Sequence, residues 1–169
     1  SPTETPVSEL TVHFIDVGQA DAAVLQCGDD TMMIDGGNVA DSSLIVAYLK
    51  KLNIDNIDYM VCTHAHEDHV GGLSAPLSVM PVSAVYAPSA EADSKAYQNF
   101  KRKAADQNTE IMHPENYESF PFGSARVEIL ACPDNADNLN NTSIILKVTH
   151  KNKSFLFTGD AEREEEQTL

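Results

Sequence analysis

The stretch "THAHEDHVGG", residues 63–72, holds three histidines and an aspartate within six consecutive positions. It follows an apolar run that is typical of a buried strand. Side chains two residues apart point the same way in extended backbone, so His64 and His66 are expected to reach one ion. Asp68 and His69 follow across an expected turn, which brings them toward a second ion nearby. The stretch therefore predicts a metal site at the end of a strand.

The chemistry of these side chains narrows the choice of metal. Imidazole combined with carboxylate suits zinc, manganese or iron better than calcium or magnesium. Gly71 and Gly72 are expected to permit a tight turn and a close approach of the backbone to the site. A solvated polar loop or isolated core histidines are the alternative explanation. An HxHxDH pattern directly after a buried strand favours metal binding instead.

The rest of the chain alternates strand-like and helix-like segments. We predict strands at 11–17, 22–27, 31–34, 57–63, 84–86, 109–112 and 125–131, and a hairpin of 143–149 and 154–158. We predict helices at 41–52 and 93–106. The apolar residues expected to share the buried face of the first helix are Leu44, Ile45, Tyr48, Leu49 and Leu52. The pattern predicts an α/β chain (mixed α+β) with a mixed sheet covered by helices.

Length and composition fit one ordinary globular core, since the chain has 169 residues and 42% hydrophobic content. Residues 1–9 are expected to be a linker or tag remnant, and residues 10–169 one domain. Three widely spaced cysteines without CxxC spacing predict neither a disulfide framework nor a zinc finger. No stretch is typical of a membrane helix or a signal peptide.

The charge balance restricts the partners. The formal net charge is −15, and the largest basic strip is Lys101, Arg102 and Lys103. A surface of this kind disfavours tight binding to duplex DNA or to anionic membranes, because no broad cationic track releases counterions.

The sequence also resembles a known family. "THAHEDHVGG" resembles the HxHxDH signature of the metallo-β-lactamase fold superfamily. "HFIDVGQADAAVLQ" (13–26), "MMIDGG" (32–37), "NNTSIILKV" (140–148) and "FLFTGD" (155–160) are similar, in the same order, to one branch of it. That branch includes the metallo-β-lactamase-like domain of bacterial late-competence DNA-uptake channel proteins. Ala20 departs from the branch, which usually has glycine there. The resemblance implies an αββα sandwich.

The resemblance implies roles for particular residues. His64 and His66 match the histidines of a first metal site, and Asp68 and His69 match ligands of a second. Asp68 is also expected to orient the attacking water. Asp160, which ends "FLFTGD", matches the aspartate that bridges the two metals; a turn residue or helix cap is the alternative.

Three further positions have less defined roles. Asp35 in "MMIDGG" is similar to the aspartate that supports the histidine loop from beneath, or else it is a turn residue before Gly-Gly. Many superfamily members have another histidine in the region that here contains Asn140 and Asn141. These asparagines either face the metal or the substrate, or are ordinary turn residues, which we favour.

The family continues past the "TGD" motif and supplies a further histidine there. The chain ends at Leu169, so it is expected to be the N-terminal two-thirds of the αββα sandwich, incomplete at its C-terminal end. Apolar sheet surface left uncovered in such a fragment predicts self-association.

The implied function is metal-dependent hydrolysis with one or two divalent ions, zinc first and manganese second. The branch implies a phosphodiester substrate, either a small phosphodiester or single-stranded DNA, cleaved by a metal-activated water. The alternatives are a metal-binding but inactive fragment, a hydrolase of a non-phosphate ester or amide, and a non-catalytic interaction module. A bacterial origin is implied, and both an extracytoplasmic and a cytoplasmic location fit.

Overall fold

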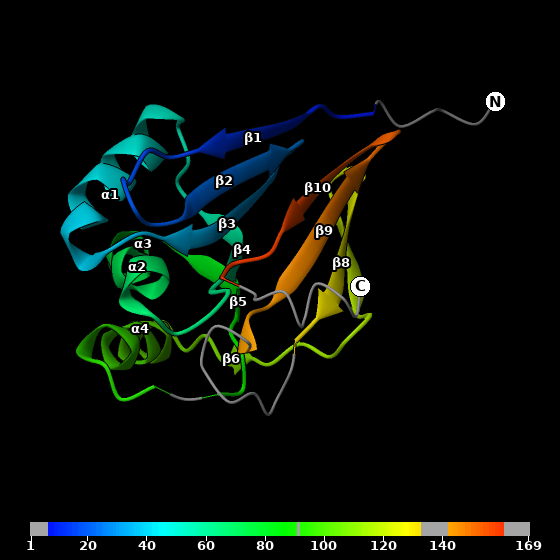
Figure 1. The fold of residues 1–169 in the computed structure, drawn as a ribbon. Helices are drawn as coiled ribbons and strands as arrows, with labels where there is room; N and C mark the ends of the chain where they lie inside the picture. Colours follow the sequence, from blue (N-terminus) through cyan, green and yellow to red (C-terminus); the bar gives the residue numbers. More distant parts are fainter. Residues whose placement is uncertain (1–6, 91, 133–141, 161–169) are drawn as a thin grey trace.

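Two sheets and a layer of helices make up the computed structural model, which describes residues 7–90, 92–132 and 142–160 (Figure 1). The first sheet contains β1 (Leu10–Phe14), β2 (Ala22–Cys27), β3 (Asp30–Gly36), β4 (Ile57–Val61), β5 (Val82–Tyr86) and β6 (Ile111–Met112). The second contains β7 (Ser119–Phe122), β8 (Ala125–Ala131), β9 (Ile145–His150) and β10 (Lys153–Phe157). The helices are α1 (Ser42–Lys51), α2 (Glu67–Val70), α3 (Ser74–Val79) and α4 (Lys95–Asp106), with short 3-10 helices η1 (Val39–Asp41) and η2 (Gly71–Leu73).

The strand order explains where a site can form. The first sheet has the order β1-β2-β3-β4-β5-β6, with antiparallel pairing up to β3 and parallel pairing beyond it. The second sheet has the order β10-β9-β8-β7 and is antiparallel throughout. Because β3, β4 and β5 are parallel, their carboxyl ends meet at one edge of the sheet. Ligands bind at such edges in mixed α/β folds.

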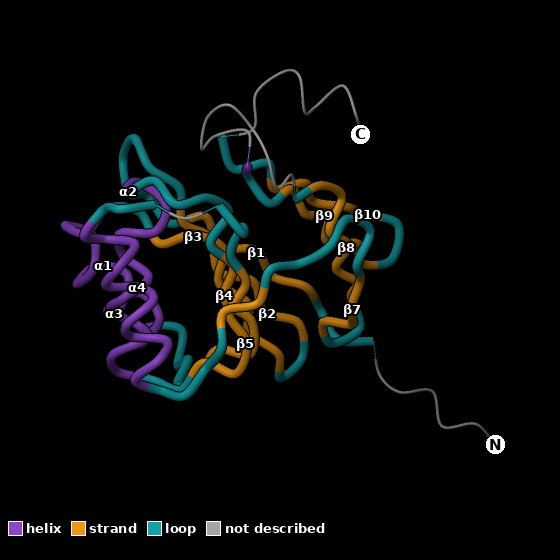
Figure 2. The backbone as a smooth tube through the Cα atoms, turned by 90° about the horizontal axis from the view of Figure 1, so that it is seen from below, coloured by secondary structure: helices purple, strands orange, loops and turns teal. Residues whose placement is uncertain are grey.

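The helices cover one face of the first sheet, and the second sheet packs against its other face (Figure 2). Alternate residues of a central strand serve the two interfaces: Val24 of β2 packs toward the helices, and Leu25 packs toward the second sheet. Both side chains are fully buried, as expected for a strand covered on both faces. The predicted mixed α/β class is confirmed, and the described residues form one layer of helices and two layers of strands.

Most predicted elements are present with small shifts at their ends, but some details of the prediction were wrong. Asp68 and His69 do not follow a turn, because they lie inside the short helix α2. Leu44 does not share the buried face of α1, since its side chain is 45% exposed. The strand β7 was not predicted. It contains Pro121, which is tolerated because β7 is an edge strand.

Gly71 and Gly72 act through close packing, and the expected tight turn is absent because both residues continue a helical path. A Cβ atom on Gly72 would overlap the carbonyl oxygen of Gly36, and one on Gly71 would overlap the backbone nitrogen of Val39. The two glycines therefore let the end of α2 lie directly against the segment that follows β3. This close approach is to the backbone that follows β3, whereas the sequence predicted a close approach of the backbone to the metal site.

Two other expectations concern the whole chain. The three cysteines, Cys27, Cys62 and Cys132, are all buried. Among the residues that the structure describes, none of the helices has the length and apolar character needed to span a membrane. Residues 1–6 of the expected linker and residues 161–169 lie outside the described residues.

Candidate metal centre

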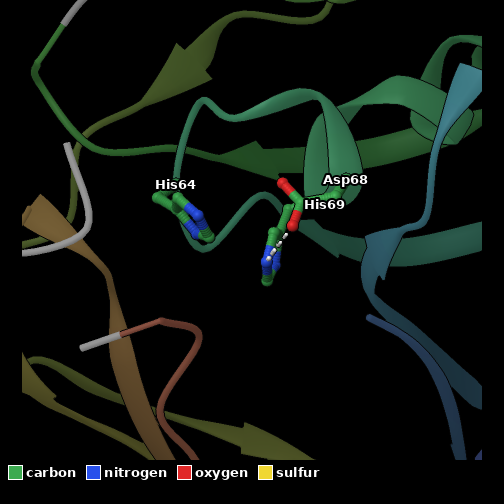
Figure 3. Close-up of side chains that lie close together, drawn as sticks. All are labelled: His64, Asp68 and His69. Carbon is green, nitrogen blue, oxygen red and sulfur yellow. Dashed lines mark ion pairs between the residues drawn. The ribbon is translucent and has the colours of Figure 1, made fainter. Parts of the chain in front are cut away.

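Five segments meet at the carboxyl edge of the parallel strands. They are the loop between β1 and β2, the end of β3, the loop after β4, the first turn of α2, and the end of β10. Figure 3 shows His64 on the loop after β4, with Asp68 and His69 projecting from α2 into the same space. The structure thus brings together side chains from positions as far apart as 21 and 160.

Asp35 reaches this edge because β3 is irregular there. The pairing of β2 with β3 shifts between Ala22 and Ala23, which face Gly36 and Ile34, so Asp35 has no cross-strand partner. Its backbone has φ of 57°, a left-handed conformation that aspartate tolerates better than most residues. A β-bulge of this kind re-aims a side chain. Here it turns the Asp35 carboxylate toward the histidine loop.

The Asp35 carboxylate is almost fully buried and accepts three hydrogen bonds. Thr63 donates two of them, from its backbone nitrogen at 2.7 Å and from its hydroxyl at 2.6 Å. The third comes from Nδ1 of His69 at 2.7 Å. An ionised carboxylate only accepts hydrogen bonds, so His69 must carry its proton on Nδ1. Nε2 of His69 faces the cluster, and once it has released the second proton of the imidazolium its lone pair can bind an ion, as expected for a metal-ligating histidine.

A similar argument fixes the tautomer of His64. The Thr63 hydroxyl has given its hydrogen to Asp35, so at 3.3 Å it can only accept from Nδ1 of His64. Nε2 of His64 is then unprotonated. This atom is completely buried and has no hydrogen-bond partner among the described residues. A buried unsatisfied nitrogen is costly unless something binds it.

The pKa values of the two histidines move in opposite directions. Burial, reinforced by the nearby His69, lowers the pKa of His64 to about 4, so its imidazole is neutral at pH 7. Burial alone would also lower the pKa of His69, but the hydrogen bond to Asp35 and the charges of Asp35, Asp160 and Asp68 raise it to about 9. Strongly perturbed pKa values of this kind gather at functional sites.

The distances between the facing atoms fit a coordinated ion. One oxygen of Asp160 lies 3.4 Å from Nε2 of His64 and 3.3 Å from Nε2 of His69. The Nε2 atom of His69 also lies 3.6 Å from an oxygen of Asp68 and 3.6 Å from an oxygen of Asp21. Ligand atoms about 2.0–2.1 Å from a tetrahedral ion lie about 3.3 Å from one another. These atoms are therefore spaced as ligands around an ion would be.

The residues form overlapping groups of three. The groups whose ligand atoms lie within 4.8 Å of one another are His64, Asp68 and His69; His64, His66 and Asp160; and Asp21, His69 and Asp160. The second group joins the predicted first-site pair to the predicted bridging aspartate. Asp160 belongs to two groups, which is the position a bridging carboxylate would need. His64 also groups with Asp68 and His69, so the two predicted pairs adjoin each other without a sharp boundary.

Asp160 reaches the cluster through the turn that ends β10. Gly159 has φ of 54°, and a Cβ atom there would lie 2.8 Å from the hydroxyl oxygen of Thr63. Only glycine therefore fits between β10 and the histidine loop. The loop is tied from the other side by a hydrogen bond from Ile144 N to Thr63 O, at 2.8 Å. Asn140 and Asn141, which precede that point, lie outside the described residues.

Sequence reasoning missed two residues of the site. Asp21 is 60% exposed, and burial of the remainder, opposed by His69, raises its pKa. Asp21 is the last residue of the "DVGQAD" stretch (16–21), which resembles the family branch. That motif is a signal from which its place in the site could have been predicted. Thr63 is the first residue of "THAHEDHVGG", and its role is to donate two hydrogen bonds to Asp35. That contact depends on the β-bulge at Asp35, for which the sequence gives no signal.

A pocket of about 190 Å³ adjoins the cluster. Asp21, Asp35 and Thr63 line its polar end, and Phe14 and Phe157 line its apolar end. The two aromatic rings lie 6.1 Å apart, so β1 and β10 face each other across this space. The pocket gives a small molecule or an additional side chain access to the side of the cluster.

The donor set fits a divalent cation. Four carboxylates, those of Asp21, Asp35, Asp68 and Asp160, surround imidazoles whose Nε2 atoms face inward. Without a cation this arrangement concentrates negative charge and leaves a buried nitrogen unpaired. A bound ion relieves both costs, and nitrogen with carboxylate oxygen is a ligand set typical of zinc.

Comparison with known proteins gives the same assignment of fold. The family model described as the Metallo-beta-lactamase superfamily matches residues 15–130, more than half of the chain. A metallo-beta-lactamase with the HARLDQ motif from Cronobacter sakazakii has a similar structure, with a TM-score of 0.61 at 18% identity, and the match covers 87% of this chain and 58% of that one. At this identity the likeness concerns the fold.

Two curated relatives match nearly the whole chain. ComE operon protein 3 from Bacillus subtilis is 24% identical over 96% of the chain, and Competence protein ComA from Neisseria gonorrhoeae is 25% identical over 99%. The chain spans only 23% and 22% of the lengths of these two proteins. The similarity agrees with the branch expected from the sequence motifs.

Proposed function

The chain belongs to the metallo-beta-lactamase superfamily, and we propose that it is a metal-dependent hydrolase that cleaves phosphodiester bonds. The observation that carries the metal requirement is the buried Nε2 of His64, which has no hydrogen-bond partner among the described residues and lies 3.4 Å from an oxygen of Asp160. The branch resemblance and the two competence-named relatives support a phosphodiester substrate.

We assign the metal ligands to His64, His66, Asp68, His69 and Asp160, with Asp21 added from the structure. One or two divalent ions fit these groups, zinc first and manganese second. An ion held by these residues would supply a bound water of lowered pKa, about 7 for zinc, and a positive charge beside a phosphoryl oxygen.

The chain's own residues then orient the reaction. The Asp68 side chain is 39% exposed and lies beside Nε2 of His69, so it can hold a water at the open side of the cluster and accept its proton. Asp35 keeps His69 in the one tautomer that presents Nε2. Asp160, also 39% exposed, lies between the two histidines and sets the spacing of the groups around it.

The direct test is hydrolysis of bis(p-nitrophenyl) phosphate by the full chain with added zinc or manganese. We expect turnover that is lost in His66→Ala and Asp68→Ala. His113→Ala and Asp30→Ala are matched controls, because His113 and Asp30 each make a single hydrogen bond away from the cluster. These controls should keep wild-type rates.

The outcomes separate the alternatives. Metal binding without cleavage of the diester, with every divalent metal tried, would mean a binding protein and would refute the hydrolase. Cleavage of p-nitrophenyl acetate or a β-lactam, but not of the diester, would mean that the substrate is a carboxylic ester or an amide and not a phosphodiester. Full activity in both His66→Ala and Asp68→Ala would mean that the cluster takes no part in the reaction.

A further inference from the structure

The helix α4 has a charge opposite to that of the rest of the chain. It carries four of the eleven basic residues and only one of the 26 acidic residues. The basic residues are Lys95, Lys101, Arg102 and Lys103. In a chain with net charge −15, a solvated helix face would be expected to share the acidic character of its surroundings.

A groove of about 660 Å³ follows this helix, lined by Val39, Lys95, Ala96, Gln98, Asn99 and Arg102. We call it the α4 groove. Among the described residues, its lining includes two cations and two amides and no carboxylate. Val39 adds an exposed apolar surface, since its side chain is 49% exposed. The groove thus offers charge for phosphates, amide groups for polar edges and an apolar surface for bases.

The α4 groove lies on the same edge of the molecule as the metal cluster. The far end of α4 returns to the start of β5, where the Gln107 side chain accepts a hydrogen bond from Val82 N. Lys95 therefore begins the helix at the carboxyl edge of the sheet. Val39 lies against Gly71, which is three residues, or about one helical turn, beyond the ligand Asp68. The helix α2 itself packs against α4.

The position of Lys95 strengthens the positive potential of the groove. It is the first residue of α4, where a cation is unfavourable because the amino end of a helix already carries partial positive charge. The first turn of α4 contains no acidic residue to offset it. Arg102 is held toward Asn99, whose side-chain oxygen accepts a hydrogen bond from the guanidinium. Both cations are exposed and available to a ligand.

We propose that the α4 groove binds the phosphate backbone of single-stranded nucleic acid, with Lys95 and Arg102 contacting phosphates that flank the bond cleaved at the metal cluster. This inference rests on the proposed phosphodiester hydrolysis and names its substrate. A single strand suits the molecule better than a duplex, because the cationic surface is one narrow groove within an acidic protein.

The test measures binding of a fluorescein-labelled oligothymidylate by anisotropy over a series of salt concentrations, with the full chain and EDTA so that no turnover occurs. Neutralising two phosphate contacts should lower the salt slope by about 1.4 and weaken binding on the order of tenfold for Lys95→Ala/Arg102→Ala. The matched control is Lys50→Ala/Lys51→Ala. It removes the same charge from two exposed lysines at the carboxyl end of α1 and should bind within about twofold of wild type.

The proposal is overturned if both double variants lose equal affinity, if the groove variant binds as wild type does, or if the wild type binds no oligonucleotide. Equally tight binding of duplex, or binding of anionic vesicles in place of the oligonucleotide, also overturns it. Hydrolysis of bis(p-nitrophenyl) phosphate is measured in parallel and should be unchanged in the groove variant. Groove-dependent binding without any diester cleavage by the wild type would refute the hydrolase and leave the groove assignment standing.

Discussion

The metal cluster has two halves that differ in how they are held. The buried half is fixed by hydrogen bonds within the protein and consists of Asp35, Thr63, His64 and His69. The exposed half projects from loop and element ends and consists of Asp21, His66, Asp68 and Asp160. In the exposed half, each described contact of an aspartate with the cluster is an ion-pair distance of 3.3–3.6 Å.

This difference indicates that the buried half contributes to the stability of the fold, whereas the exposed half acts mainly in binding the ion. The buried half is pre-organised, so its geometry should persist whether or not an ion is present. The exposed carboxylates have few other partners, so an ion is what would order them. We therefore expect changes in the buried half to cost stability as well as metal affinity, and changes in the exposed half to cost metal affinity alone.

Asp35→Asn should have the largest effect. The amide cannot accept all three hydrogen bonds that the carboxylate accepts, so one buried donor loses its partner. We expect the free energy of unfolding of the metal-free protein to fall by about 2–4 kcal/mol and metal affinity to fall about 10- to 100-fold. Urea unfolding with EDTA measures the first effect. Asp30→Asn is the control, since Asp30 accepts a single exposed hydrogen bond, from Gly123. Equal losses in both variants would break the comparison.

Asp160→Asn should separate affinity from stability. The carboxylate is 39% exposed and lies between His64 and His69, so its charge matters mainly to an ion. We expect zinc affinity to fall on the order of 100-fold and the metal-free stability to change by less than about 0.5 kcal/mol. Competition with a chromophoric chelator measures the affinity. A metal-free protein destabilised as strongly as Asp35→Asn would mean that both halves are structural.

The two histidines predict a defined pH dependence of metal binding. His69 has a pKa of about 9 and is protonated at pH 7, so it must release a proton to bind an ion, whereas His64, at about 4, is already neutral. Apparent metal affinity should therefore rise about tenfold per pH unit between pH 7 and pH 9. Calorimetry in buffers of different ionisation enthalpy should show release of about one proton at pH 7. No proton release would contradict the assignment of His69.

The smallest expected effect concerns self-association. Phe14 on the edge strand β1 and Leu156 on the edge strand β10 are 69% and 55% exposed, and unpaired strand edges favour pairing between chains. Phe14→Ser/Leu156→Lys should lower the weight-average mass in sedimentation at high concentration and leave metal binding intact. Val79→Ser, which removes an exposed apolar side chain on α3, is the control. A wild-type chain that stays monomeric would exclude association through these edges.

The sequence could point to the cluster because His64, His66, Asp68 and His69 lie close together in the chain. Two histidines one residue apart, followed by Asp68 and His69, give a dense set of metal-ligating side chains that is visible without a structure. The structure adds Asp160 to the same space, where the family resemblance placed it. Asp35 was expected to support the loop, and its contacts with Thr63 and His69 agree with that expectation.

What could not be predicted depends on backbone geometry and on long-range packing. The bulge that aims Asp35 is a property of the β2–β3 pairing, and Asp21 joins the site only because the β1–β2 loop folds over α2. The helical path through Asp68 was missed because four residues are too few to show a period. Leu44 was wrongly assigned to the core because periodicity finds the apolar face but not the part of that face that is covered.

The central claim is that the cluster is a metal centre. Its most direct test is elemental analysis of the full chain purified without added metal, beside His66→Ala/Asp68→Ala, with folding of both checked by circular dichroism. We predict at least one divalent ion per chain in the wild type, zinc foremost, and only background metal in the folded double variant. A wild type that stays metal-free even after equilibration with zinc and manganese, or a double variant with the full metal content, would contradict the account.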